Sequence, residues 1–211
     1  MLPVIILGIG AEARVASDII QINDNILYGF FTLDQAASED SLHDVSVLGT
    51  VHDPIFNELV EKDDRIDVAI ADDDITNRRA FRDVLKEATE KAPVNIFHPH
   101  ASISAFASLG HGNLIGAGTV VSPDAQIGDM NQIGSNVVIA ADAKLGHFVN
   151  VGHGCIISAS AIIEDEVTIE AGCIIASGVV VQSGAHISAG SIVTLPVNRN
   201  AKVGGNPATH R

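Results

Sequence analysis

The chain has 211 residues, enough for one large domain or two small ones, and 46% of them are hydrophobic, which allows a sizeable core. Aromatic residues make up only 4%, so we expect a core built from Ile, Val and Ala. The formal net charge of −14 argues against a nucleic acid as partner, because a uniformly acidic surface repels phosphate backbones.

The opening segment MLPVIILGIG is apolar, but it lacks a basic leader and a convincing cleavage site. We therefore interpret it as a buried strand that ends in glycines, and not as a signal peptide. No apolar run approaches the roughly 20 residues that span a bilayer, so membrane insertion is not expected. A cytoplasmic location is the simplest expectation.

Strand-like and helix-like segments alternate from the start of the chain to about residue 95. This alternation predicts a parallel sheet with helices packed on it, that is, an α/β Rossmann-like domain over residues 1–95. The expected strands are VIILGIG, ILYGFF, SVLGT, IDVAIA and VNIFHP, and the expected helices are EARVASDIIQIN, DPIFNELVEK and TNRRAFRDVLKEATE. The acidic run Asp72-Asp73-Asp74 is expected to be a solvated loop, with Asp74 or Thr76 as the N-cap of the last helix.

From Ala101 onward a six-residue repeat replaces this alternation. Ile, Leu or Val occupies every sixth position without interruption, and the residue two places earlier is small: usually Ala, Val, Cys, Ser, Thr or Asn. The 16 repeated positions are Ile103, Leu109, Ile115, Val121, Ile127, Ile133, Ile139, Leu145, Val151, Ile157, Ile163, Ile169, Ile175, Val181, Ile187 and Val193.

This repeat predicts a parallel β-helix over residues 96–211. Each hexad forms one short strand and one corner, three hexads form a triangular coil of 18 residues, and the large apolar residue points inward. Cys155 and Cys173, 18 residues apart, should stack on adjacent coils as reduced core thiols. The terminal segment LPVNRNAKVGGNPATHR leaves the rhythm and should fold back as a tail. Such three-sided prisms usually trimerise, so we expect a homotrimer.

Three segments carry a resemblance to a known family. They are the opening ILGIGAEARVASDII, similar to a strand–turn–helix usually written GxGGHGRVV, the segment HPHASIS at His98–Ser104, and the ending VGGNPA at Val203–Ala208. Together with the hexads they resemble the two-domain hexapeptide-repeat sugar acetyltransferases, which include nucleotide-sugar 4-amino N-acetyltransferases and sialic acid O-acetyltransferases. The resemblance covers nearly the whole chain and implies that the β-helix is left-handed.

The resemblance also implies an activity: acetyl transfer from acetyl-CoA, as cosubstrate, to the amino group of a nucleotide-linked amino sugar. In this family a histidine of an HD or HE pair is the general base, and a backbone amide one coil further on stabilises the oxyanion. The pair falls on Ala141-Asp142, so the acid is present and the base position is vacant. The oxyanion amide falls on Ala159.

The remaining family sites are carried over in the same way. Asn150 replaces a histidine near the CoA thioester, and Ala171 and Ala189, with Ala159, would line the CoA groove between two solenoids of the trimer. The substrate-binding positions fall on Gly8, Gly10, Glu12, Arg14 and Asp34. Glu12 replaces a histidine and suits the helix dipole, but it would repel a pyrophosphate there, and it is equally interpretable as an ordinary first-turn residue.

His147 and His153 follow Ala141 by 6 and 12 residues and should lie at the other two corners of the prism. Neither can replace the missing imidazole within one chain, although either could serve a neighbouring chain in a trimer; His111 lies two coils below His147, too far from the site. Three explanations for Ala141 remain open, in this order: natural divergence towards another substrate, a substitution made to trap substrates, and a pseudoenzyme.

Three classes of function therefore compete. The first is the acetyl-CoA-dependent acyltransferase, the second is a non-catalytic binding or scaffold protein, and the third is a nicotinamide-dependent enzyme based on Gly8-x-Gly10-x-x-Ala13. The third match is weak, because the second strand lacks a clear ribose-binding acid at its end. The nine histidines show no metal-ligand spacing, so no metal is expected.

Overall fold

The computed structural model describes residues 2–34, 41–62 and 66–210. The chain divides into two units, residues Met1–Pro99 and His100–Arg211. Within the described residues, no helix has both the length and the apolar character needed to cross a membrane.

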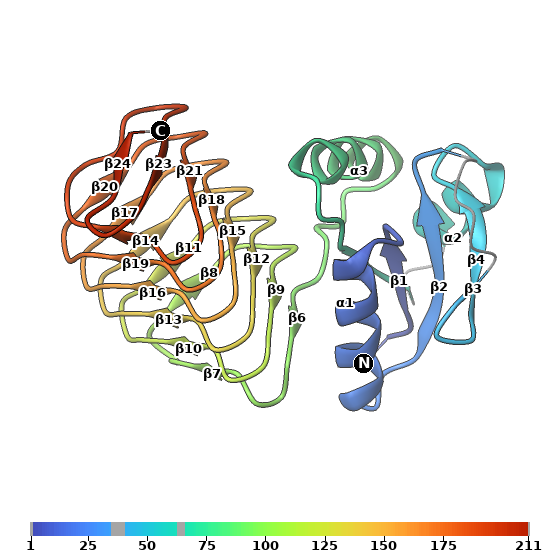
Figure 1. Cartoon of the computed structure of the whole chain (residues 1–211). Helices are drawn as coiled ribbons and strands as arrows, with labels where there is room; N and C mark the ends of the chain where they lie inside the picture. The colour runs from blue at the N-terminus through green and yellow to red at the C-terminus, as the bar shows by residue number, and fades with distance from the viewer. Residues whose placement is uncertain (1, 35–40, 63–65, 211) are drawn as a thin grey trace. The chain divides into compact units, whose positions relative to one another are not determined.

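The first unit is a five-stranded sheet with the strand order β3-β4-β2-β1-β5 (Figure 1). All neighbouring pairs are parallel except β3 with β4, a short antiparallel pair that the sequence pattern did not predict. The predicted strand VNIFHP is reduced to the two residues of β6. The strands of this sheet are β1 (Val4–Leu7), β2 (Leu27–Thr32), β3 (Ser41–Leu42), β4 (Val45–Thr50) and β5 (Asp67–Ile70); β6 (Ile96–Phe97) is not part of it. The helices are α1 (Ala11–Ile22), α2 (Pro54–Lys62) and α3 (Ile75–Ala88).

Strand β1 is central and all four of its residues are buried, which explains its continuous run of apolar side chains. Helix α1 packs against β1 and β2, and α3 packs against β5. Strands β2 and β5 flank β1 on opposite sides. The strand order therefore reverses at β1, and in open α/β sheets ligands bind in the crevice at the carboxyl ends of the strands at such a point.

The second unit is a three-sided parallel β-helix, and Figure 1 shows its coils stacked from the green first coil to the red C-terminal tail. The first sheet contains β7 (Ser102–Ile103), β10 (Val120–Val121), β13 (Val138–Ile139), β16 (Ile156–Ile157), β19 (Ile174–Ile175) and β22 (Ile192–Val193). The second sheet contains β8 (Ser108–Leu109), β11 (Gln126–Ile127), β14 (Lys144–Leu145), β17 (Ile162–Ile163) and β20 (Val180–Val181). The third sheet contains β6, β9 (Leu114–Ile115), β12 (Gln132–Ile133), β15 (Asn150–Val151), β18 (Thr168–Ile169), β21 (His186–Ile187), β23 (Lys202–Gly204) and β24 (Thr209–His210).

Each of the predicted hexad positions is the second residue of one strand from β7 to β22. Their side chains are buried from Ile115 onward, whereas Ile103 and Leu109 in the first coil are half-buried. Paired strands from β7 to β22 are 18 residues apart, as in Val138 with Ile156. The predicted fold class, a Rossmann-like α/β unit and a left-handed parallel β-helix, is confirmed.

The corners of the prism share a backbone conformation that the sequence analysis did not foresee. From Gly112 to Gly190 the second residue of each corner turn has a positive φ, near 60° at Asp142 and Ser160 and near 70° at Gly172. This left-handed region is costly for most residues and tolerated best by Gly, Asn and Asp. Asp142 therefore meets a backbone requirement of the coil, independent of any role in chemistry.

The C-terminal tail folds back onto the last coil, as predicted. Strand β23 pairs in parallel with β21, and β24 returns antiparallel to β23. Val197 forms an isolated parallel bridge with Val181. The tail thereby covers strand edges that the last coil would otherwise expose.

The two cysteines lie on adjacent coils as free, buried thiols, as predicted. The Cys173 N–H donates to Cys155 Sγ at 3.4 Å. The hydrogen bond between the two thiols, and then burial, raise the pKa of Cys155, so that this thiol stays protonated and unreactive.

Candidate active site

Ala141 and Asp142 form one turn of a column of stacked turns that we call the Ala141 corner: residues 123–124, 141–142, 159–160 and 177–178, between the first and second sheets. The stacking is regular, because Ser160 N donates to Ala141 O at 3.0 Å and Gly178 N donates to Ala159 O at 3.1 Å. Ala159 therefore lies one coil above Ala141. None of the described residues of this corner is a histidine.

The backbone N–H of Ala159 has no hydrogen-bond partner among the described residues, and Ala159 is exposed. At the other two corners, side chains accept several equivalent amides. His147 N donates to Asp165 Oδ1 and Ser135 N donates to His153 Nδ1, both at 2.8 Å. The Ala159 amide is thus available to donate to a ligand, as an oxyanion donor must be.

The two histidines considered as substitutes for the base lie at the other two corners, as predicted, and their ring nitrogens are already engaged. His153 Nδ1 accepts the N–H of Ser135 at 2.8 Å, and His147 Nδ1 lies 3.0 Å from Asp129 N and 3.1 Å from Asp129 Oδ2. A neutral imidazole that accepts at Nδ1 carries its proton on Nε2. Neither histidine therefore offers a free lone pair in this arrangement.

His186 on β21 has a different arrangement. Its Nε2 lies 2.8 Å from Glu170 Oε1, while Glu170 Oε2 accepts the N–H of Ala189 at 2.8 Å. A carboxylate that orients one ring nitrogen is the usual partner of a catalytic imidazole. However, His186 lies on the third sheet, 45 residues (two and a half coils) beyond Ala141, and so does not reach the Ala141 corner of its own chain.

The predicted CoA-contacting residues do not converge within one chain. Asn150 lies on the outer side of β15 in the third sheet, and Ala171 and Ala189 are exposed turn residues stacked at the corner of His153. The Ala189 amide is held by Glu170 and is not free. These positions and the Ala141 corner lie at different edges of the prism, so a site that contains both requires more than one chain.

In the α/β unit, a cavity of about 210 Å³ lies at the carboxyl ends of β1, β2 and β5, where the strand order reverses. The predicted residues Gly8 and Asp34 line it, and Thr32 Oγ1 donates to Asp34 O at 2.8 Å. Asp72 and Asn77 line it as well and hydrogen-bond each other at 3.0 Å. Of the five predicted substrate-binding residues, Gly10, Glu12 and Arg14 are therefore not among the cavity's lining residues, and the contribution of the loop after β5 was not predicted.

Gly8 is required by the backbone. Its φ is +122°, and a Cβ at this position would lie 2.1 Å from Ala71 O. Gly10 is the N-cap of α1, with an extended backbone and no side-chain cap of its own. A Cβ at Gly10 would lie 3.0 Å from Asp73 Oδ2, so a carboxylate occupies the space next to this turn.

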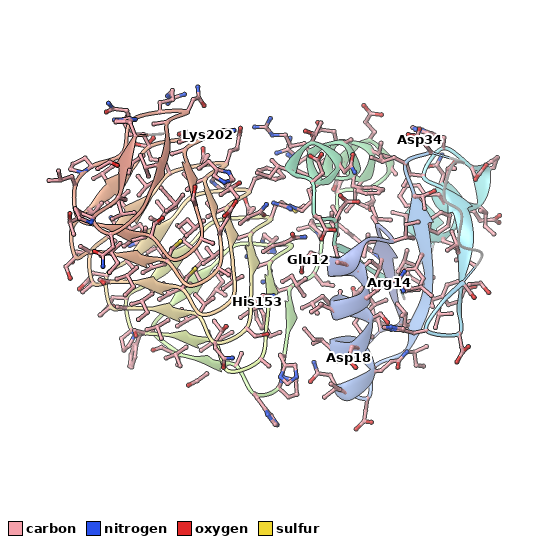
Figure 2. All side chains as sticks on the ribbon, viewed as in Figure 1. Glu12, Arg14, Asp18, Asp34, His153 and Lys202 are labelled. Atoms are coloured by element: carbon pink, nitrogen blue, oxygen red, sulfur yellow. The ribbon has the colours of Figure 1, made fainter. Side chains whose placement is uncertain are left out.

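That carboxylate caps the first turn of α1. Asp73 Oδ2 accepts the N–H of Ala11 at 3.3 Å, and Asp73 Oδ1 accepts the N–H of Glu12 at 3.2 Å. Figure 2 labels Glu12 and Arg14 on this helix, and Arg14 is exposed. The loop 72–74 is therefore more than the solvated loop that was predicted, although Asp74 is the N-cap of α3, accepting the N–H of Thr76 at 2.6 Å.

A buried arginine supports this loop. Arg78 of α3 is fully buried, and its Nη1 donates to Asp72 O at 2.8 Å and to Asp73 O at 3.4 Å. Burial lowers the pKa of Arg78 to about 10, with the charges of Asp72 and Glu12 opposing the shift, so the side chain remains a cation at neutral pH. Glu12 therefore lies near a positive charge, which sequence reasoning did not anticipate.

Among the described residues, no group of three or more His, Cys, Asp or Glu side chains is arranged to hold a metal ion.

Comparison with known proteins gives no match to any family model and none to the curated proteins searched. Several solved structures nevertheless share the fold over almost the whole chain. PerB from Caulobacter crescentus, in complex with CoA and GDP-perosamine, has a TM-score of 0.90 and 21% identity, covering 99% of this chain and 97% of that one. The acetyltransferase domain of PglB from Neisseria gonorrhoeae, in complex with acetyl coenzyme A, has a TM-score of 0.87 and 22% identity, covering 99% and 98%.

WeeI from Acinetobacter baumannii matches with a TM-score of 0.83 and 19% identity over 100% of both chains. These likenesses extend over both units and establish the two-unit fold. At such identities they do not by themselves transfer an activity.

Proposed function

We propose that the chain is an acetyl-CoA-dependent acetyltransferase that acts on the amino group of a sugar. The observation that carries this proposal is the unpartnered Ala159 N–H, one coil above Ala141 and exposed to a ligand. The fold shared with PerB and the PglB domain, whose structures contain CoA or acetyl-CoA, supports the same reaction class.

In the proposed step, the amine nitrogen attacks the thioester carbonyl carbon and the Ala159 N–H stabilises the oxyanion. Collapse of the tetrahedral intermediate breaks the C–S bond and releases CoA as its thiolate. The proton lost by the nitrogen passes to Asp142 or to water, and the thiolate is protonated in turn. Asp142 is exposed and, among the described residues, its carboxylate accepts no hydrogen bond, so it is accessible to the amine.

The vacant base position at Ala141 is compatible with substrate binding. One of the similar structures is a variant of GDP-perosamine N-acetyltransferase in which a histidine is replaced by alanine, and it is in complex with both CoA and GDP-perosamine. By analogy, we expect this chain to bind its substrates and to transfer the acetyl group slowly, because a positioned general base contributes about 10²–10⁴ in rate.

We further propose that the active unit is a homotrimer. The outward residues of the first sheet form what we call the apolar stripe: Val120, Val138, Ile156, Ile174 and Ile192. Val120 is 39% exposed and Ile156 is 40% exposed. A continuous aliphatic face of this kind favours association with another chain. Association would also bring an edge that carries Asn150 or Ala171 to the Ala141 corner of a neighbour.

Calorimetry and an acetyl-transfer assay test the proposal together. The chain is expected to bind CoA and to acetylate at least one member of a panel of amino sugars, free or nucleotide-linked. The nucleotide-linked sugars test the narrower class of acceptor that the family resemblance implies.

The substitution Asp142→Asn should lower the transfer rate and leave the melting temperature unchanged, because Asn also tolerates the positive φ of 60°. Asp124→Asn, one coil below at φ 62°, is the matched control. Absence of CoA binding at millimolar ligand would instead favour a non-catalytic scaffold.

A further inference from the structure

The N-terminus of α1 lies beside the cavity of the α/β unit, and two of its first amides, those of Ala11 and Glu12, are already satisfied by the chain itself. The N–H groups of Ala11 and Glu12 both donate to the two carboxylate oxygens of Asp73, a residue more than 60 positions later in the chain. A helix N-terminus that follows a glycine turn normally offers these amides to an anionic ligand. Here a side chain of the protein takes the place of that anion.

The loop that carries Asp73 is held from several sides. Asp72 Oδ1 accepts hydrogen bonds from the N–H of Asp74 at 2.9 Å and from Asn77 Nδ2 at 3.0 Å. Beneath the loop, the buried Arg78 donates to the carbonyls of Asp72 and Asp73. Moving the loop away from α1 would remove hydrogen bonds from a buried cation, which is costly. A ligand therefore has to displace a well-anchored carboxylate to reach the α1 amides.

We propose that Asp73 is a specificity-determining residue, which excludes a diphosphate from the α1 N-terminus and so selects amino sugars that are not linked to a nucleoside diphosphate. This inference rests on the proposed function and narrows its acceptor. Two carboxylates that line the adjacent cavity, those of Asp34 and Asp72, would also oppose the negative charge of a diphosphate there.

Titration calorimetry with UDP, on the full chain, tests this proposal. The wild-type chain should bind UDP weakly or not at all, whereas Asp73→Ala should bind it about tenfold or more tightly, because the amides and the positive end of α1 become available. Asp74→Asn is the matched control: it removes the same charge from the same loop and keeps an N-cap for α3, so UDP binding should stay as in the wild type. Should Asp73→Ala not fold, Asp73→Asn serves in its place.

Equal UDP affinity in the wild type and the Asp73 variant, including no binding to either, would overturn the proposal. Titration of the same proteins with CoA keeps this result separate from the proposed function. If neither protein bound CoA, acetyl transfer would be in doubt, whatever the outcome with UDP. If both bound CoA and only the Asp73 variant bound UDP, both proposals would stand.

Discussion

At the scale of single residues, Ala141 decides how fast the proposed chemistry can proceed. Its methyl side chain can neither accept nor donate a proton, and the described part of its corner contains no histidine that could do so. Asp142 and water remain as proton acceptors, and a carboxylate is a weaker base than an imidazole. Acetyl transfer by the wild type should therefore depend on the fraction of the acceptor that arrives as a free amine.

Installing an imidazole tests this reasoning. Ala141→His is expected to raise acetyl transfer by roughly 10²–10⁴, because the side chain would stand beside Asp142 and below the Ala159 amide. The gain should diminish as the pH falls below about 6.5, where an ordinary histidine becomes protonated. Ala141→Asn, polar but without a base, is the control. A rate unchanged in Ala141→His would show that the acceptor site, and not the missing base, limits the reaction.

The same two sites show how far single residues can be interpreted from sequence. The stacking of Ala159 one coil above Ala141 was predicted correctly, because counting by 18 needs no knowledge of side-chain contacts. The cap on α1 could not be found in this way, because it joins Asp73 to amides that are distant in sequence. The sequence does contain an acidic run between a strand and a helix, with Arg78 one turn further on. Several loop conformations are compatible with such a run, so it does not predict the cap.

At the scale of elements, each two-residue strand of the solenoid has one inward and one outward side chain. In β17, Ile163 is 1% exposed and Ile162 is 38% exposed. The pattern was predictable because inward positions must be apolar in every coil. Apolar residues therefore recur at every sixth position of the sequence. Corner conformation was not predictable, since residues as different as Met130, Phe148 and Gly172 all adopt a positive φ.

Neighbouring isoleucines of β17 provide a matched test. Ile163→Ala should lower the free energy of unfolding by about 2–5 kcal/mol, because it leaves a cavity between adjacent coils. Ile162→Ala should cost about 1 kcal/mol or less, since the side chain already meets solvent. Urea denaturation followed by circular dichroism measures both changes. A larger loss from Ile162→Ala would mean that the assignment of inward and outward faces is wrong.

At the scale of the whole molecule, the proposed site is complete only if chains associate. The Ala141 corner lies away from the two positions predicted to contact CoA, Asn150 on the third sheet and Ala171 at another corner of the prism. A symmetric closed assembly would bring unlike edges of neighbouring chains together. Light scattering on the wild-type chain should therefore give the mass of three chains.

A charge placed in the apolar stripe should break this assembly. Ile156→Asp is expected to reduce the mass to that of one chain and to abolish CoA binding, because a carboxylate cannot be buried there without a partner. Ser108→Asp, on the outer side of the second sheet, should leave both properties unchanged. A wild-type chain that is monomeric yet binds CoA would refute the shared site.

Because every coil has 18 residues, insertions and deletions in the β-helix keep its corners aligned only when they comprise whole coils. Removing or duplicating a whole coil below Ala141 or above Ala159 would leave every later residue on its original edge, and Ala159 would remain one coil above Ala141. A gain or loss of a single hexad would instead rotate everything beyond it by one third of a turn. The oxyanion amide and the carboxylate would then face different neighbours, so only changes by complete coils are compatible with the geometry proposed for catalysis.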